Sequence, residues 1–454
     1  MRAVIFGALL AIASGEVTFV EPQRSITCPD VGTCEITLTV SRVETLTAYE
    51  YEPTSGTRGR GHMVEVGADG ELDFLLEEPD DAQLLQPVLV DGHTRRNVIV
   101  FNNQLPGPTI IGYEQQLVKI RVINDLSSDS ISVHWHGQYV RGQPFMDGVP
   151  FVTQCPILPG TEFTYEFNLY PSGSYWYHSH SGYQRYDGLF GALIVKKRTQ
   201  TPTDYEDLPD QHTITLFEFF QTEGSHYFGE RNIQATGYID PVKSHHLYHG
   251  VSATDGSSIS SGPMHAAVIN HAGWLYSPDA ATCQRMANTS LPVFTVESGK
   301  KYRFRLIGTQ SDIGFRFSIQ GHKMRLVATD GVDITTDHIT SEIDYIIIYS
   351  GERYDFILEA NQTVDNYLVV METVADPDAL NTRGFCIKSH RAYAVLQYEG
   401  ANTSIPQNLD ENYDPTLRCP DSTQPCFAVN CPFKNYPTSH NTNCLLYTSD
   451  AADE

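Results

Sequence analysis

The chain carries an internal repeat of a strand, a turn and a second strand, and this repeat limits the folds that it can adopt. Residues 161–177 (TEFTYEFNLYPSGSYWY) match residues 351–367 (GERYDFILEANQTVDNY) in pattern, and a closing apolar strand follows each copy. Self-similarity of this kind indicates repeated structural units. We therefore expect two related β-sandwich domains, at residues 84–200 and 205–400.

Short alternating runs of apolar and polar residues occur along the whole chain, whereas helical periodicity is hard to find. The runs are rich in Val, Ile, Tyr and Phe and are separated by Gly, Pro, Asn and Asp, as in QLVKIRVIND (116–125) and KYRFRLIG (301–308). This pattern is typical of β-strands joined by turns. The sequence therefore predicts an all-β fold of sandwiches or barrels.

The segments outside the two domains differ from them in composition. Residues 1–15 contain a positive charge, then an apolar run, and end in small residues of the kind found at signal-peptidase cleavage sites. This order predicts a cleaved secretory signal and hence a secreted protein. A buried N-terminal strand is the alternative. Residues 16–83 form a preface with two polar loops. Residues 401–444 are rich in Pro, Asn and Cys, which suits a disulfide-tied linker to a further domain.

Charge, apolar runs and cysteines narrow the possible partners and the compartment. The formal net charge of −25 argues against nucleic acid, because an acidic surface repels phosphate. After the signal, no apolar run approaches the ~18–20 residues of a membrane span, so no membrane span is expected.

Nine cysteines favour disulfides in a secreted chain, although their pairing stays open. Three Asn-x-Ser/Thr sites fit glycosylation, at Asn288, Asn361 and Asn402.

Two pairs of histidines occur in the first predicted β-domain, each with one residue between its members. His134 and His136 flank a tryptophan in SVHWHGQ, and His178 and His180 lie in YWYHSHSG. Because alternate residues of a strand share a face, roughly 6.6–7 Å apart, each pair projects together while Trp135 points the other way. If the two strands are neighbours, four imidazoles converge.

These pairs indicate a metal site. One His-x-His pair alone is more typical of two exposed histidines, but two pairs in one domain favour ligands. Neutral imidazole suits zinc, copper, iron and nickel, and the intrinsic affinity order puts copper highest among them. Two ligands on one strand can serve neighbouring metals, so the pairs favour a multinuclear cluster.

Several segments together resemble the first two domains of a laccase-type multicopper oxidase, closest to the invertebrate laccases. The resemblance covers roughly residues 85–400. It is carried by the paired-histidine strands and by QLPGPTI (104–110), MDGVPFVTQCPI (146–157), GHKMRLVATDG (321–331) and YSGERYDFILEANQ (349–362).

The resemblance implies tandem cupredoxin-like Greek-key β-sandwiches, two of an expected three, and copper as the cofactor. In this family a type 1 copper in the third domain passes electrons to a trinuclear cluster between the first and third domains. His134 resembles the ligand that the first domain gives to the type 2 copper. His136, His178 and His180 resemble ligands of the type 3 pair. Asp147 resembles an acidic residue that helps to deliver protons, although a turn aspartate is the alternative.

The sequence departs from the family after the second domain. It contains neither an HPxHxHG-type strand nor an HCHxxxH-type strand, so it offers no type 1 site. Residues 445–454 (LLYTSDAADE) resemble a translated sequencing adapter rather than native protein; an ordinary acidic tail is the alternative. We therefore expect a chain truncated before the third domain and inactive by itself.

The leading hypothesis is a secreted laccase-like copper oxidase that couples one-electron oxidation of phenols or diphenols to reduction of dioxygen to water. Its partners would be a small phenolic substrate and dioxygen. A ferroxidase or an ascorbate-oxidase-like enzyme would share the first-domain ligands. A non-catalytic two-domain copper-binding protein is an alternative of another class, as is a structural β-sandwich with vestigial histidines.

Overall fold

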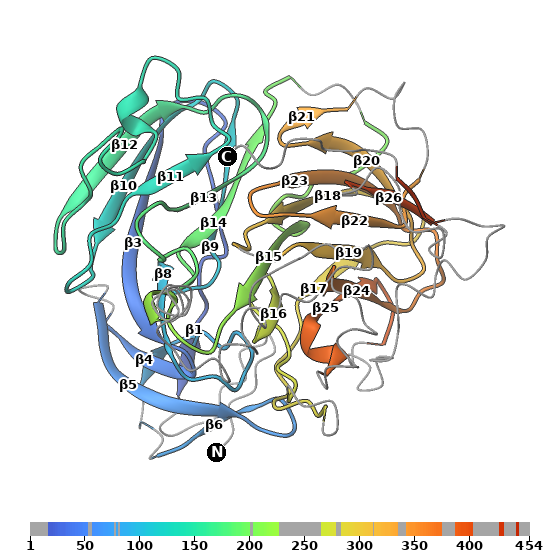
Figure 1. Ribbon diagram of the computed structural model, residues 1–454, viewed down its shortest axis with the longest axis horizontal. Helices are drawn as coiled ribbons and strands as arrows, with labels where there is room; N and C mark the ends of the chain where they lie inside the picture. The colour runs from blue at the N-terminus through green and yellow to red at the C-terminus, as the bar shows by residue number, and fades with distance from the viewer. Residues whose placement is uncertain are drawn as a thin grey trace, which may run out of the picture.

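The structure is a computed structural model of the chain, and it is built almost entirely from β-strands (Figure 1). This confirms the predicted all-β class and the tandem cupredoxin-like sandwiches. The residues that the structure describes are 17–52, 57–76, 79, 82–199, 203–226, 265–277, 283–311, 313–334, 342–374, 386–402, 426–430 and 442–444. The predicted signal (1–15) and the tail (445–454) lie outside them.

Domain 1 is a sandwich of two sheets, on the left of Figure 1. The four-stranded sheet has the order β12 (Glu162–Asn168), β10 (Leu117–Asn124), β3 (Cys34–Glu44) and β8 (Asn97–Phe101). The five-stranded sheet has the order β11 (Val133–His136), β13 (Gly173–Ser179), β14 (Phe190–Lys196), β9 (Gly107–Tyr113) and β2 (Ser25–Thr27). The core between these sheets includes Leu38, Ile120, Trp135, Tyr177 and Leu193.

Domain 2 is a second sandwich, on the right of Figure 1. Its six-stranded sheet has the order β16 (Ala266–Ile269), β15 (Thr213–Phe219), β18 (Lys301–Gly308), β23 (Arg353–Glu359), β20 (Met324–Thr329) and β21 (Val332–Asp333). Its seven-stranded sheet has the order β17 (Val293–Val296), β25 (Arg391–Tyr398), β24 (Asn366–Thr373), β19 (Phe315–Ile319), β22 (Tyr345–Ile348), β26 (Cys426–Val429) and β27 (Thr442–Cys444).

A smaller sheet of five strands lies beside the sandwiches, at the bottom of Figure 1. Its order is β1 (Thr18–Val20), β7 (Gln83–Leu85), β4 (Thr47–Glu52), β5 (Thr57–Val66) and β6 (Leu72–Phe74). Two short 3-10 helices complete the described elements, η1 (Pro144–Met146) and η2 (Ile387–His390).

The predicted repeat corresponds to matching strands in the two sandwiches. The first copy supplies β12 and β13, and the second supplies β23 and β24. β12 pairs antiparallel with β10 as β23 does with β18, and each copy ends in an antiparallel pair, β13 with β14 and β24 with β25. The same pattern of residues thus produces the same local pairing twice.

The sheets cross two of the predicted boundaries. β2 and β3 belong to the predicted preface (16–83), but they pair inside the two sheets of domain 1, so that sandwich begins before residue 84. β26 lies in the predicted linker (401–444) and pairs with β22 of domain 2. Local composition did not reveal these strands because their partners are distant in sequence.

Two disulfides join described residues. Cys28 pairs with Cys34 across the turn before β3, and Cys283 pairs with Cys386 across 103 positions of sequence. Cys155 is exposed and has a free thiol. These pairings support the prediction of a disulfide-bonded chain and resolve part of the pairing that the sequence left open.

The two domains are joined by a shared apolar cluster. It contains Trp176 and Phe190 of domain 1 together with Phe217 and Ile307 of domain 2, all fully buried. β13 is therefore buried on both faces, one against the core of domain 1 and one against domain 2, which explains why its residues do not alternate in exposure. This strand also carries His178, and His180 follows directly after its last residue.

Candidate metal centre

The two histidine pairs lie on neighbouring strands. β11 and β13 pair antiparallel, with His134 directly opposite His178 and His136 opposite Trp176. This fulfils the condition under which the sequence predicted that the imidazoles converge. The structure brings them together because the chain between the strands forms β12 in the opposite sheet and then returns.

The four imidazoles form one cluster. The ring centroid of His134 lies 5.6 Å from that of His136, 5.5 Å from that of His178 and 5.6 Å from that of His180. One nitrogen from each of His134, His136 and His178 lies within 4.8 Å of the others, which suits a metal ion between them. His180 lies at the exposed edge, with its ring 6.1 Å from that of His178.

The strand that carries His134 and His136 is anchored by the side chain of Trp135. Trp135 points to the opposite face of β11, as predicted, and is fully buried in the core of domain 1. Its ring packs edge-on against Tyr165 at 5.3 Å and also contacts Phe167 and Tyr177. Burying so large a side chain fixes the position of β11, and therefore the Cα positions of His134 and His136.

Hydrogen bonds orient two of the rings. His134 Nδ1–H donates to the backbone oxygen of Asp147 at 2.7 Å, and His178 Nδ1–H donates to the backbone oxygen of Ser179 at 2.9 Å. A carbonyl oxygen can only accept, so Nδ1 carries a proton in both rings, and in a neutral ring the lone pair is then on Nε2. For His178, this Nε2 lies 3.4 Å from His136 Nδ1 inside the cluster.

Asp147 lies beside the cluster in the loop that follows η1. Its carboxylate Oδ1 is 3.4 Å from His134 Nδ1, and its side chain is partly exposed. The next residue, Gly148, has φ +87°, and a Cβ there would lie 1.8 Å from the backbone oxygen of Val133. Only glycine allows so close an approach in this conformation, so the sequence DG holds the Asp147 loop against β11.

Burial favours the neutral form of three of the imidazoles, those of His136, His178 and His180. Burial, with a smaller contribution from the positive charge of Arg353, lowers the pKa of His136 to about 2. Burial, assisted by Arg185, holds the pKa of His178 well below its ordinary value, and burial also lowers the pKa of His180. A ligand imidazole must be unprotonated, so this donor set fits a copper ion, for which uncharged nitrogen is a suitable ligand.

Domain 2 closes one side of the cluster, which sequence reasoning missed. A Cβ on Gly351 would lie only 3.0 Å from Cε1 of His136, so the turn before β23 packs directly on this ring. The sequence GERYDF was interpreted as part of a repeated strand and of the family resemblance, not as a contact of the first domain. Its contact with the first domain depends on how the sandwiches dock, which no local pattern records.

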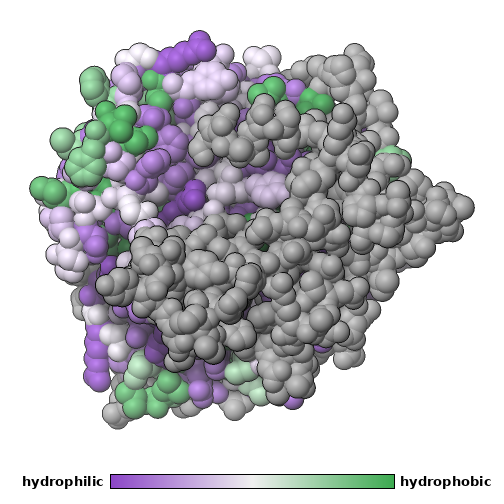
Figure 2. Space-filling view, in the orientation of Figure 1, coloured by the Kyte–Doolittle hydropathy of each residue, from purple (hydrophilic) through white to green (hydrophobic). Residues whose placement is uncertain are grey.

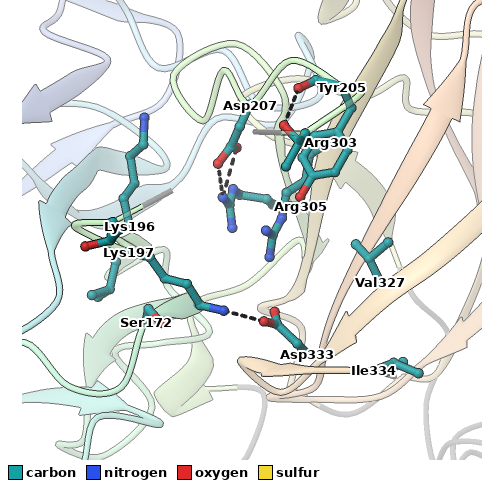
Figure 3. A pocket seen from close by; sticks show the side chains of 14 residues that line it. Ser172, Lys196, Lys197, Tyr205, Asp207, Arg303, Arg305, Val327, Asp333 and Ile334 are labelled. Carbon is teal, nitrogen blue, oxygen red and sulfur yellow. Dashed lines mark hydrogen bonds and ion pairs between the residues drawn. The ribbon is translucent and has the colours of Figure 1, made fainter. Parts of the chain in front are cut away.

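A cavity of about 300 Å³ lies elsewhere on the boundary between the domains (Figure 3). Two pairs of its charged side chains interact: Arg305 donates to both oxygens of Asp207, and Lys197 pairs with Asp333. None of the described residues that line this cavity is a histidine, and none belongs to the imidazole cluster.

Two other sequence predictions concern a histidine-rich stretch and membrane spans. The polar stretch SHHLYHG (244–250), whose composition predicts a surface loop, lies outside the described residues. Within the described ranges, none of the helices has the length and apolar character needed to cross a membrane.

Comparison with known proteins identifies the family. Two domain models, both described as multicopper oxidase, match residues 85–200 and 210–401. The chain is 35% identical over 326 residues to Laccase-4 of Trametes villosa, a match that covers 70% of this chain and 53% of the relative. It is 32% identical over 370 residues to Laccase-1 of Pleurotus ostreatus, covering 78% of this chain and 59% of the relative. The chain thus spans about half the length of the curated relatives that it matches.

Solved structures show the same fold. The laccase from Botrytis aclada aligns with a TM-score of 0.54 and 26% identity, covering 83% of this chain and 54% of that one. The blue copper oxidase from Nitrosomonas europaea aligns with a TM-score of 0.51 and 21% identity, covering 84% of this chain and 90% of that one, which supports the fold alone. The particular likeness to invertebrate laccases stays a prediction. With two matched family domains and paired histidines converging on neighbouring strands, the chain belongs to the multicopper oxidase family and is of the laccase type.

Proposed function

We propose that this chain is part of a secreted laccase-like copper oxidase and that His134, His136, His178 and His180 are its first-domain copper ligands. The oxidase would couple one-electron oxidation of phenols or diphenols to reduction of dioxygen to water. The observation that carries the proposal is the convergence of unprotonated imidazoles from two neighbouring strands. Family membership supports copper as the metal.

Bound copper supplies one-electron redox chemistry that amino-acid side chains lack. The chain's own residues prepare the site. The backbone oxygens of Asp147 and Ser179 fix the tautomers of His134 and His178, so that each ring keeps an unprotonated Nε2. Burial keeps the pKa of His136 low, so that protons do not compete with the metal across the ordinary pH range.

Asp147 is the proposed proton-handling residue. Reduction of dioxygen to water consumes protons, and a carboxylate near the ligands can take protons from solvent and pass them inward. Its side chain is 28% exposed, and Oδ1 lies 3.4 Å from His134 Nδ1, so it contacts both solvent and the cluster. In this role, its carboxylate would exchange protons while its backbone oxygen continues to orient His134.

Copper retention by the purified chain tests the ligand assignment. We expect the wild type to retain Cu²⁺ in equilibrium dialysis and the double variant His134→Ala/His178→Ala to lose it. His93→Ala is the matched control, because His93 is exposed and lies outside the cluster. Equal retention by wild type and double variant would favour the structural β-sandwich with vestigial histidines.

The oxidase activity is tested at the level of the gene. Sequencing cDNA across the codons for residues 430–454 shows whether the reading frame continues into a segment with a His-Cys-His sequence. Such a segment would support the laccase-like oxidase. A reproducible stop codon after residue 454 would instead support the non-catalytic copper-binding protein.

A further inference from the structure

The turn before β23 brings domain 2 against a predicted ligand of domain 1. Gly351 has φ +81°, and a Cβ on it would lie 3.0 Å from Cε1 and 3.3 Å from Nε2 of His136. At these distances an added Cβ would have to displace the ring or the turn by a few tenths of an ångström. The backbone at Gly351 therefore limits how far the His136 ring can move toward domain 2.

Arg353, two residues later, ties this turn to the histidine strands. Its side chain is buried, and Nε donates to the backbone oxygen of Ser174 on β13 at 3.2 Å. Nη1 donates to the backbone oxygen of Gly351 at 2.8 Å and pairs with Asp330 at 3.2 Å. One guanidinium thus connects β13 of domain 1 with the Gly351 turn of domain 2.

The same guanidinium also contacts the end of β11. A Cβ on Gly137, the residue after His136, would lie 2.6 Å from Nη2 of Arg353. The guanidinium also lies 5.5 Å from the centre of the Tyr175 ring, on β13. Arg353 therefore fills the space beside the backbone that carries His136 and holds β11, β13 and the domain 2 turn in one arrangement.

We propose that Gly351 and Arg353 are positioning residues for the imidazole of His136, so that domain 2 sets the geometry of the metal centre in domain 1. The proposal rests on the proposed function, because it takes the imidazole cluster as the copper site. Residues that support metal ligands in this way commonly change metal affinity roughly 10–100-fold when they are replaced.

Gly351→Ala tests the contact directly, and Gly299→Ala is its matched control. Both glycines lie in turns of domain 2, with φ +81° and +85°, so alanine has a similar backbone cost at each. Only at Gly351 does the new methyl group meet His136, since nothing lies within 4 Å of a Cβ at Gly299. We expect Gly351→Ala to weaken Cu²⁺ binding about 10-fold or more and to alter the electron paramagnetic resonance spectrum, with Gly299→Ala unchanged.

Arg353 provides a second, independent variant. Arg353→Met keeps an extended side chain but loses all the hydrogen bonds of the guanidinium group. Arg353→Lys keeps the positive charge but lacks the planar guanidinium group with its several donors. We expect affinity for Cu²⁺ to fall in the order wild type, Arg353→Lys, Arg353→Met. Denaturant unfolding of each variant is measured in parallel, which identifies a variant that does not fold. If one of the two Arg353 variants does not fold, the Cu²⁺ affinity of the other is compared with that of the wild type.

A measurement without metal separates this proposal from the proposed function. In the metal-free chain with isotope-labelled histidine, we expect Gly351→Ala and Arg353→Met to shift the ring resonances of His136 but not those of the distant, exposed His93. If wild type retained no Cu²⁺, the proposed function would fail, while shifted His136 resonances would still support the positioning role. Unchanged resonances and unchanged affinity in folded variants would overturn the positioning role.

Discussion

His134 and His178 lie directly opposite each other on β11 and β13, although they are 44 positions apart in the sequence. Their ring centroids lie 5.5 Å apart. This pairing makes one cluster from two separate His-x-His sequences. It places the candidate metal centre at the edge of the sheet of domain 1 that meets domain 2.

The copper-loaded 454-residue chain should lack the intense blue colour of a copper–thiolate site and should not oxidise diphenols. The reason is chemical: the sequence contains no His-Cys-His segment to provide a type 1 site, whose thiolate accepts electrons from the substrate. Absorbance in the visible range and oxygen consumption with a diphenol check this. Sustained turnover would mean that another residue accepts the electrons.

Asp355→Ala should destabilise the chain strongly. The Oδ2 atom of this buried carboxylate accepts hydrogen bonds from Ser174 of domain 1 at 2.9 Å and from Arg303 and Arg305 of domain 2, each at 3.0 Å. Removing it leaves buried guanidinium charge uncompensated, which costs about 3–5 kcal/mol of unfolding free energy.

The matched control for Asp355 is Asp333→Ala, whose exposed pair with Lys197 should contribute no more than about 1 kcal/mol. Denaturant unfolding measures both variants. Equal destabilisation by the two would contradict the assigned importance of the buried network.

The two disulfides should contribute unequally to stability. A bridge restricts the unfolded chain more when it closes a longer loop. Cys283–Cys386 spans 103 positions and Cys28–Cys34 spans 6, so the Cys283→Ala/Cys386→Ala variant should lose about twice as much unfolding free energy as Cys28→Ala/Cys34→Ala. Denaturant midpoints of both variants test the order, and the reverse order would contradict this entropic account.

Glu352 should make stability fall as pH rises from about 4.5 to about 7. Burial raises the pKa of this carboxyl from 4.5 to about 7, so the folded chain holds a proton that the unfolded chain releases in this range. The contribution is fully present below pH 4.5 and is lost as pH passes 7, amounting to at most about 3 kcal/mol.

The variant Glu352→Gln should flatten this part of the pH profile, because the amide cannot ionise and can still accept the hydrogen bond from the Tyr349 backbone. Unfolding free energies measured between pH 4 and 8 provide the comparison. An unchanged slope in the variant would assign the pH dependence to other groups.

Exposed apolar side chains of domain 1 should make the chain associate at high concentration. Phe145, Phe151, Val152 and Leu158 are 70%, 86%, 81% and 60% exposed, and Figure 2 shows apolar residues gathered over the part of domain 1 that holds η1 and β12. Apolar surface of this kind favours contact with other molecules.

Sedimentation in reducing buffer, which excludes disulfides through Cys155, measures this association. Phe151→Ser/Val152→Ser should reduce it. The control Val31→Ser alters a residue of similar exposure (79%) in another part of the chain. Association that is unaffected by the double variant would place the contact elsewhere.

The sequence by itself determined the repeat, the strands within it and the identity of the candidate ligands. Alternation fixes which side chains share a face of a strand, so it could show that His134 and His136 project together and that Trp135 enters the core. The spacing of turns and apolar runs likewise predicted β12–β14 and β23–β25, because these strands depend on local residue order.

Only the tertiary structure decided which strands became neighbours. The pairing of β11 with β13, the inclusion of β3 in domain 1 and the contact of Gly351 with His136 join residues that are distant in sequence. Such contacts arise from the packing of whole sheets, whose energy is distributed over many buried side chains rather than encoded at one position. For this reason the sequence could name the candidate ligands of domain 1, but it could not show that domain 2 contacts one of them.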